Sequence, residues 1–194
     1  MRLIEPKILV FLGPQGSGKG TQSIMLAKTL GLPRAEAGQL CRDEAKKDTP
    51  LGKSIKALID KGEYLPTSLW RPVIERVFQT VDASSGMIFD GFLRTPDQLK
   101  EFDTFRTTYF LPDPLIVYLR LSQEHAIARL MKRGRVDDTP ELIATRLKWS
   151  TAKIQGILDH FRAKNEVIEI NGDQSIDVVQ QEIIDKLTKA GVIS

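Results

Sequence analysis

The sequence predicts an α/β fold, in which five parallel strands form a doubly wound sheet flanked by helices. Short apolar runs rich in β-branched or aromatic residues recur along the chain, bounded by Gly, Pro or Asn as buried parallel strands are. Segments with helical patterns and start signals separate these runs. Because each parallel strand needs a crossover to return to the same edge, this alternation indicates a parallel sheet with helices on both faces.

The apolar runs predict strands at residues 7–12, 32–36, 87–89, 115–119 and 167–170. Two of the helices between them begin in the same way, with an N-capping Thr and a Pro at the first helical position, at Thr95-Pro96 and Thr139-Pro140. The second of these helices is expected to end near Ala163. Residues 37–80 break the rhythm, because two or three helices follow one another where one would serve as a crossover. We therefore expect an inserted helical segment in this region.

Composition excludes several classes of protein. The chain has 194 residues, 41% hydrophobic and 27% charged, which is typical of a globular protein, and its net charge of +3 suits anionic small molecules as well as nucleic acid. Cys41 is the only cysteine, which excludes an intrachain disulfide and a four-cysteine zinc site and makes the cytoplasm the expected location. The first apolar run ends at Gly13 and is far shorter than the roughly 18 to 20 residues that span a bilayer.

A glycine-rich loop follows the first expected strand. Its sequence, Gly13-Pro14-Gln15-Gly16-Ser17-Gly18-Lys19-Gly20-Thr21, fits G-x-x-x-x-G-K, with Gly20 where Ser or Thr usually stands. The glycines let successive N–H groups turn toward phosphate oxygens, and the following helix adds the positive end of its dipole. Lys19 is then expected to reach the β and γ phosphates of a nucleotide. Because the loop lies between an apolar strand and an amphipathic helix, the expected fold is P-loop NTPase-like.

Further motifs narrow the class of P-loop protein. After the loop, which continues to Gln22, they are Ala37-Gly38-Gln39-Leu40-Cys41-Arg42, then Asp60-Lys61-Gly62-Glu63-Tyr64-Leu65-Pro66, then Phe89-Asp90-Gly91-Phe92-Leu93-Arg94-Thr95-Pro96-Asp97-Gln98. Arg129 and Arg133, the stretch Gly134-Arg135-Val136-Asp137-Asp138 and Arg146-Leu147 complete the series. In this order, from residue 7 to about 180, the chain resembles the nucleoside monophosphate kinases, adenylate kinase foremost.

The resemblance implies a reaction in which the γ-phosphoryl group of ATP passes reversibly to AMP, or to another nucleoside monophosphate, to give two nucleoside diphosphates. The acceptor is already an anion, so no general base is required, and catalysis reduces to in-line positioning and neutralisation of charge. The residues that the resemblance assigns to catalysis are all cationic: Lys19, Arg94, Arg133, Arg135 and Arg146.

Binding residues follow from the same resemblance. For ATP they are Gly13, Gly16, Ser17, Gly18, Lys19, Gly20, Thr21, Arg129, Arg133 and Gly172, with the flat guanidinium of Arg129 stacked over the adenine. For the acceptor they are Ala37, Gly38, Arg42, Leu65, Gly91, Arg94, Gln98, Arg135 and Arg146. Asp90 ends the third apolar run, where its carboxylate, helped by Thr21, is expected to face Mg²⁺ through water. No zinc is expected.

Alternatives remain at several positions. Gln98 either reads the acceptor adenine through its amide or caps its helix as a Gln at the third position. Adenylate kinases commonly have Thr at the position of Ala37. The Ala resembles the UMP/CMP kinases, which are therefore the alternative to adenylate kinase. Gln98, by contrast, favours AMP as the acceptor. Asp90 also fits a plain strand-end turn, and Arg129 and Arg133 also fit a solvated helix face.

Two classes outside the kinases fit less well. A P-loop switch protein would need a guanine-reading Asn-Lys-x-Asp run, which the sequence lacks. A nucleic-acid-binding ATPase would need a basic stripe with interleaved aromatic residues, whereas only 7% of the residues are aromatic and the arginines stand singly.

The motifs also predict the division of the chain. We expect one P-loop kinase domain over residues 1–194, with a core of 1–36, 67–133 and 140–194, an acceptor-binding insertion at 37–66 and a minimal lid turn at 134–139. Only three residues separate Arg133 from Asp137, fewer than in short-lid members of the family. A monomer or small homo-oligomer is expected, with no nucleic acid or membrane partner.

Overall fold

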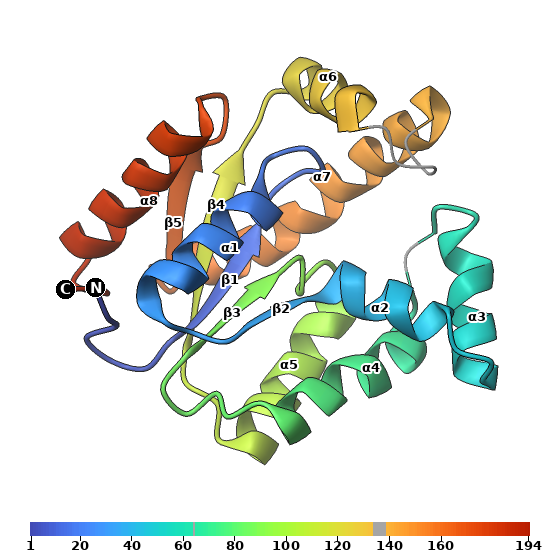
Figure 1. Ribbon diagram of the computed structural model, residues 1–194, viewed down its shortest axis with the longest axis horizontal. Coiled ribbons are helices and arrows are strands. Elements are labelled where there is room, and N and C mark those ends of the chain that lie inside the picture. The colour runs from blue at the N-terminus through green and yellow to red at the C-terminus, as the bar shows by residue number, and fades with distance from the viewer. Residues whose placement is uncertain (64, 134–138) are drawn as a thin grey trace.

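The computed structural model of the protein describes residues 1–63, 65–133 and 139–194. Its described residues form a five-stranded sheet of order β2-β3-β1-β4-β5, in which every neighbouring pair is parallel (Figure 1). The strands are β1 (Ile8–Leu12), β2 (Arg34–Glu36), β3 (Met87–Asp90), β4 (Pro114–Arg120) and β5 (Val167–Asn171). The predicted sheet of five parallel strands is confirmed.

Helices cover both faces of this sheet (Figure 1). They are α1 (Lys19–Leu30), α2 (Ala37–Ala45), α3 (Pro50–Ile59), α4 (Thr67–Thr80), α5 (Pro96–Tyr109), α6 (Gln123–Arg133), α7 (Pro140–Arg162) and α8 (Ile176–Lys189). Side chains of β1 alternate between the two faces, as the pleat of a strand requires. Ile8 and Val10 belong to the apolar cluster that includes α4, α5 and α7, whereas Leu9 and Phe11 belong to the cluster formed with α1 and α8.

The order of the strands fixes where a ligand binds. From β1 the chain passes through α1 to the edge strand β2, whereas from β3 it passes through α5 to β4, on the other side of β1. The carboxyl ends of β1 and β3 therefore flank a point where the strand order reverses, which is where open α/β sheets bind ligands. The ladder pairs Phe11 with Asp90, so the loop that follows β1 begins beside the end of β3.

Element boundaries differ from the prediction mainly at β2. This strand begins at Arg34 rather than at residue 32, because Pro33 has no N–H to donate to the ladder and contributes only its carbonyl, which accepts from the Ile88 N–H at 2.9 Å. The other strands lie within two residues of the predicted ends. Thr95 caps α5 as predicted, since its Oγ1 accepts from the Gln98 N–H at 3.2 Å.

The excess helices of residues 37–80 are α2, α3 and α4. Of these, α2 and α3 lie within residues 37–66, whereas α4 packs against the sheet through Val73, Ile74 and Val77. Within the described residues, no helix combines the length and the apolar character needed to cross a membrane.

Candidate active site

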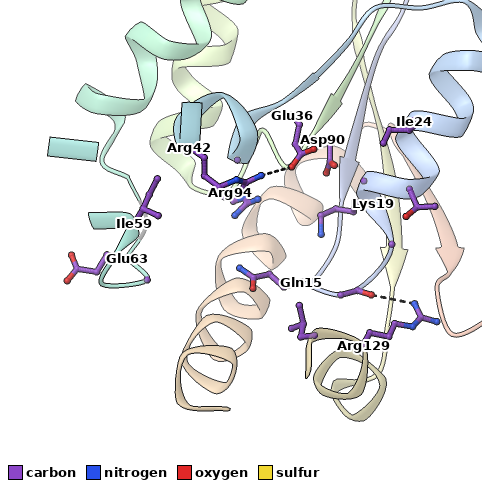
Figure 2. Close-up of a pocket in the computed structure, with 17 residues that line it drawn as sticks. Gln15, Lys19, Ile24, Glu36, Arg42, Ile59, Glu63, Asp90, Arg94 and Arg129 are labelled. Carbon is purple, nitrogen blue, oxygen red and sulfur yellow. Dashed lines mark hydrogen bonds and ion pairs between the residues drawn. The ribbon is translucent and has the colours of Figure 1, made fainter. Parts of the chain in front are cut away.

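A cleft of about 520 Å³ opens at the carboxyl edge of the sheet (Figure 2). It lies between the loop after β1, the starts of α1 and α2, the end of α3 and the side of α6. The described residues that line it are Gln15, Gly16, Gly18, Lys19, Gly20, Thr21, Ile24, Glu36, Gly38, Arg42, Ile59, Gly62, Glu63, Asp90, Arg94, Arg129 and Leu130. Their four cationic side chains come from separate segments, so the chain fold gathers positive charge at one place.

The glycine-rich loop has the backbone that binding a phosphate requires. Gly13, Gly16 and Gly18 have positive φ angles of 148°, 82° and 91°, which side chains disfavour. A Cβ at Gly13 would also lie 2.5 Å from the Leu119 carbonyl oxygen, so only glycine fits. Gly18 is the N-cap of α1, and within the described residues no side chain caps this helix end. Its first N–H groups are therefore available to an anion.

Lys19 crosses this loop. Its Nζ donates to the carbonyl oxygens of Gly13 at 2.8 Å and Pro14 at 2.7 Å, and lies 3.4 Å from the Oγ of the buried Ser17. The ammonium is thus held against the curled backbone by two of its carbonyl oxygens. A phosphate that entered here would meet both the lysine charge and the positive end of α1.

On the side of the cleft near α6, the lining residues are Arg129 and Leu130. Arg129 lies against the loop, with Nη1 3.5 Å from the Gly16 carbonyl oxygen and Nη2 3.3 Å from the Gln174 carbonyl oxygen (Figure 2). Gly172, also assigned to ATP, lies outside the set of described residues that line the cleft. It donates its N–H to the Arg120 carbonyl at 2.7 Å, and a Cβ there would lie 2.4 Å from that oxygen. Arg129 therefore has specific partners, unlike an arginine on a solvated helix face.

The opposite side of the cleft holds two more arginines. Arg42, on α2, and Arg94, after β3, both point into it (Figure 2). The Arg94 Nε donates to the Gly91 carbonyl at 3.0 Å, which folds the side chain back over the end of β3. Gly38 lines the cleft, whereas Ala37 is buried at the start of α2. Two guanidinium groups in one cleft suit a second phosphate, separate from the one at the loop.

Two residues assigned to the acceptor lie elsewhere. Gln98 is 3% exposed, and its Oε1 accepts from the Arg94 backbone N–H at 2.9 Å. The amide reaches back over the first turn of α5, as the capping alternative requires, but its Oε1 accepts from the N–H of Arg94 rather than from that of the N-cap residue Thr95. Leu65 lines a different cavity, together with Thr67 and Thr95 at the starts of α4 and α5. Both residues, like Ala37 and the buried Gly91, lie outside the set of described residues that line the main cleft.

Asp90 lies at the end of β3, beside the phosphate loop. Its Oδ2 is 3.4 Å from the position of a Cβ built on Gly20, and its side chain lines the cleft with Thr21. The same Oδ2 accepts from the Arg34 Nη2 at 3.0 Å. Asp90 is thus more than part of a strand-end turn. Its carboxylate and the Thr21 hydroxyl provide oxygen ligands of the kind that Mg²⁺ prefers, and Mg²⁺ commonly keeps several waters.

Glu36 is a cleft residue that the sequence motifs do not indicate. It ends β2 and is paired with Asp90 in the ladder, so the two carboxylates emerge side by side (Figure 2). Burial raises the pKa of Glu36, but hydrogen bonds and charges from Arg34 and Arg42 outweigh this, so its pKa lies below the ordinary value. The one available signal was its position, since ligands bind at the carboxyl ends of parallel strands.

The remaining candidate arginines lie outside the described part of the site. Arg135, with the whole of 134–138, is outside the described residues, and so are the side chains of Arg133 and Arg146. Their backbones place them at the end of α6 and within α7. No group of three or more His, Cys, Asp or Glu side chains suited to holding a metal ion occurs among the residues that the structure describes.

Comparison with known proteins finds relatives over most of the chain. The family model described as adenylate kinase matches residues 11–166. "Adenylate kinase 1" of a Nostoc species is 35% identical over 175 residues, covering 90% of this chain and 95% of that protein. "Adenylate kinase" of a Mycobacterium species is 36% identical over 171 residues, covering 88% and 93%. "Adenylate kinase" of Bifidobacterium longum is 33% identical over 183 residues, covering 92% and 98%.

Proposed function

Because the chain belongs to the adenylate kinase family of phosphotransferases, we propose that it transfers the γ-phosphoryl group of ATP reversibly to AMP, giving two ADP. The observation that carries the proposal is one cleft lined both by Lys19 of the phosphate loop and by the pair Arg42 and Arg94. The loop with Lys19 suits the phosphates of a donor nucleotide, and the two arginines suit the phosphate of an acceptor. A UMP/CMP kinase is not favoured, since the relatives compared are named adenylate kinase.

ATP is proposed to bind along the loop and α6. The N–H groups of the loop between Gln15 and Thr21 hold the β and γ phosphates, and Lys19 exchanges its carbonyl contacts for phosphate oxygens. This exchange is favourable because the oxygens of a phosphate carry more negative charge than a neutral carbonyl. The adenine then lies against Arg129, near Gly172, where a planar guanidinium stacks on an aromatic ring.

AMP is proposed to bind on the opposite side, with its phosphate between Arg42 and Arg94 and its ribose and base toward Gly38 and the insertion of residues 37–66. Its phosphate oxygen attacks the γ phosphorus of ATP and needs no base to activate it. The enzyme's contribution is to hold the two phosphates in line and to neutralise the charge that spreads over the transferred group. Arg133, Arg135 and Arg146 are proposed to complete this cationic set.

Mg²⁺ is proposed to be held through water by Asp90 and Thr21, which line the cleft beside the loop. When bound, the ion supplies further positive charge on the phosphates of the nucleotide. The lid is proposed to be the short stretch 134–139, and the segment that closes over the acceptor to be residues 37–66. The cytoplasmic location and the monomeric or small oligomeric state stay predictions.

A coupled assay of ADP formation tests the proposal. ATP with Mg²⁺ is offered with AMP, UMP, CMP and GMP in turn, at equal concentrations of acceptor. AMP should give the highest kcat/KM. Faster turnover with UMP or CMP would contradict the proposed acceptor, and no nucleoside diphosphate from any of the four would contradict the proposed reaction.

A further inference from the structure

Four charged side chains form a continuous series beside the cleft, and three of them, Glu36, Arg42 and Asp90, line it. Arg34 Nη2 donates to Asp90 Oδ2 at 3.0 Å and to Glu36 Oε2 at 3.1 Å. The other oxygen of Glu36, Oε1, accepts from Arg42 Nη2 at 3.0 Å (Figure 2). Charges alternate along this series, so each carboxylate has a cationic neighbour and the set as a whole is neutral.

The backbone places the members of this series at fixed positions. Glu36 and Asp90 are partners in the β2·β3 ladder, and Arg34 lies two residues before Glu36, on the same face of β2. Arg34 is also held from α1, because its Nε donates to the Oγ of the buried Ser23 at 2.7 Å. Its side chain is only 18% exposed. The first three groups therefore belong to the rigid sheet, whereas Arg42 belongs to α2 of the insertion.

Within the described part of the chain, Arg42 is held through one of its three nitrogens. Nη2 donates to Glu36 Oε1 at 3.0 Å and to Gln39 Oε1 at 2.9 Å, which uses both of its hydrogens. Nη1 and Nε remain for a ligand in the cleft that Arg42 lines. A guanidinium fixed at one corner presents its other donors in a set direction, and such preorganisation lowers the cost of binding.

We propose that Glu36 is a positioning residue that orients Arg42 toward the acceptor phosphate, and that Arg34 holds Glu36 in place for this task. The inference rests on the proposed function, in which that phosphate lies between Arg42 and Arg94. The series of ion pairs then fixes Arg42 relative to Asp90 and the phosphate loop. As a result, the donor and acceptor phosphates bind to groups whose relative positions are fixed.

Repulsion between Glu36 and the acceptor phosphate is the effect that opposes this role. Arg34 reduces it, because the Glu36 charge is already shared with a cation 3.1 Å away on the side facing Asp90. Since its pKa lies below the ordinary value, Glu36 is ionised throughout the neutral pH range and holds Arg42 at any pH at which the assay is run. The orienting effect on Arg42 should therefore exceed the repulsion.

The test is the Glu36→Gln variant, which removes the charge but keeps the length of the side chain. The KM for AMP should rise about tenfold, the usual scale for a hydrogen bond to a charged group, while the KM for ATP changes less than about twofold. Titration calorimetry with AMP alone should show the same loss of affinity without any turnover. Asp48→Asn is the matched control, since it removes one carboxylate from an 89% exposed position of the insertion.

A double-mutant cycle separates positioning from a purely structural role. Arg34→Gln should raise the KM for AMP in the same direction, and the two changes together should raise it by less than the product of the single effects, because both act through Arg42. Independent effects, or an unchanged or lower KM for AMP in Glu36→Gln, would overturn the inference while leaving AMP kinase activity intact. If the unchanged chain neither binds nor phosphorylates AMP, the proposed function itself is wrong, and the inference falls with it.

Discussion

Replacing Gln98 by Ala tests two roles of one side chain. In the folded protein its Oε1 accepts from the Arg94 N–H at 2.9 Å, in a position that is 3% exposed. The Ala variant leaves this N–H without its acceptor, which costs about 1 to 3 kcal/mol, and loses about 0.8 kcal/mol for each buried methylene group. We expect a loss of about 2 to 4 kcal/mol in the free energy of unfolding, which lowers Tm by about 4 to 16 °C for a chain of this size.

The same variant separates a cap from a base reader. With Oε1 committed to Arg94, the Nε2 group is what Gln98 can offer to a ring nitrogen of the acceptor adenine. If it does so, kcat/KM should fall further for AMP than for UMP or CMP. Calorimetric unfolding and the four-acceptor assay are the measurements, and Gln155→Ala, an exposed Gln bonded only to Asp159 among the described residues, is the control.

Two results would refute this reasoning. An unchanged Tm in Gln98→Ala would show that the hydrogen bond to Arg94 does not stabilise the protein. An equal loss of kcat/KM for AMP, UMP and CMP would show that Gln98 acts only by placing Arg94, and the adenine-reading role would then be wrong.

The remaining predictions concern the phosphate loop, Glu44 and the proposed lid. Lys19→Ala should lower kcat by about 10² to 10³ with little change in the far-ultraviolet spectrum, and a variant that keeps more than about a tenth of the turnover would contradict its role. Glu44, only 5% exposed, accepts from Lys47 and Arg76 at 2.6 Å each, and these contacts, led by Lys47, lower its pKa below 4.5. The free energy of unfolding of Glu44→Gln should therefore be about 1 to 3 kcal/mol lower at pH 7 than that of the unchanged chain. This difference should disappear as the pH falls through the lowered pKa of Glu44, and a difference that persists in acid would contradict the pairing. Because the proposed lid stretch, residues 134–139, is so short, ATP alone should be hydrolysed slowly by a monomer, and a monomer by light scattering that releases no phosphate would contradict this.

The local parts of the site could be predicted from the sequence. The glycines of the loop, Lys19 and Arg94 lie in short motifs whose chemistry depends on neighbours along the chain. The five strands were also predictable, because buried parallel strands need continuous apolar runs. The start of β2 was not, since it depends on which backbone groups Pro33 can offer to the strand beside it.

Contacts across the sheet could not be predicted in this way. Arg34 and Asp90 are 56 residues apart, and their ion pair exists only because β2 and β3 are neighbours in a particular register. Glu36 reaches the cleft for the same reason. At Gln98 the sequence leaves two roles open, a helix cap and a reader of the acceptor base. Only the fold shows that its Oε1 already accepts from a backbone N–H.

The central claim is that the phosphoryl group of ATP passes to AMP rather than to water. ATP radiolabelled at the γ phosphorus is incubated with Mg²⁺, unlabelled AMP and the unchanged chain, and the products are separated by chromatography, with Lys19→Ala as the blank. The account predicts that the label appears in ADP, at its β phosphorus, in step with the loss of AMP. Label found only in inorganic phosphate, with AMP unconsumed, would contradict it.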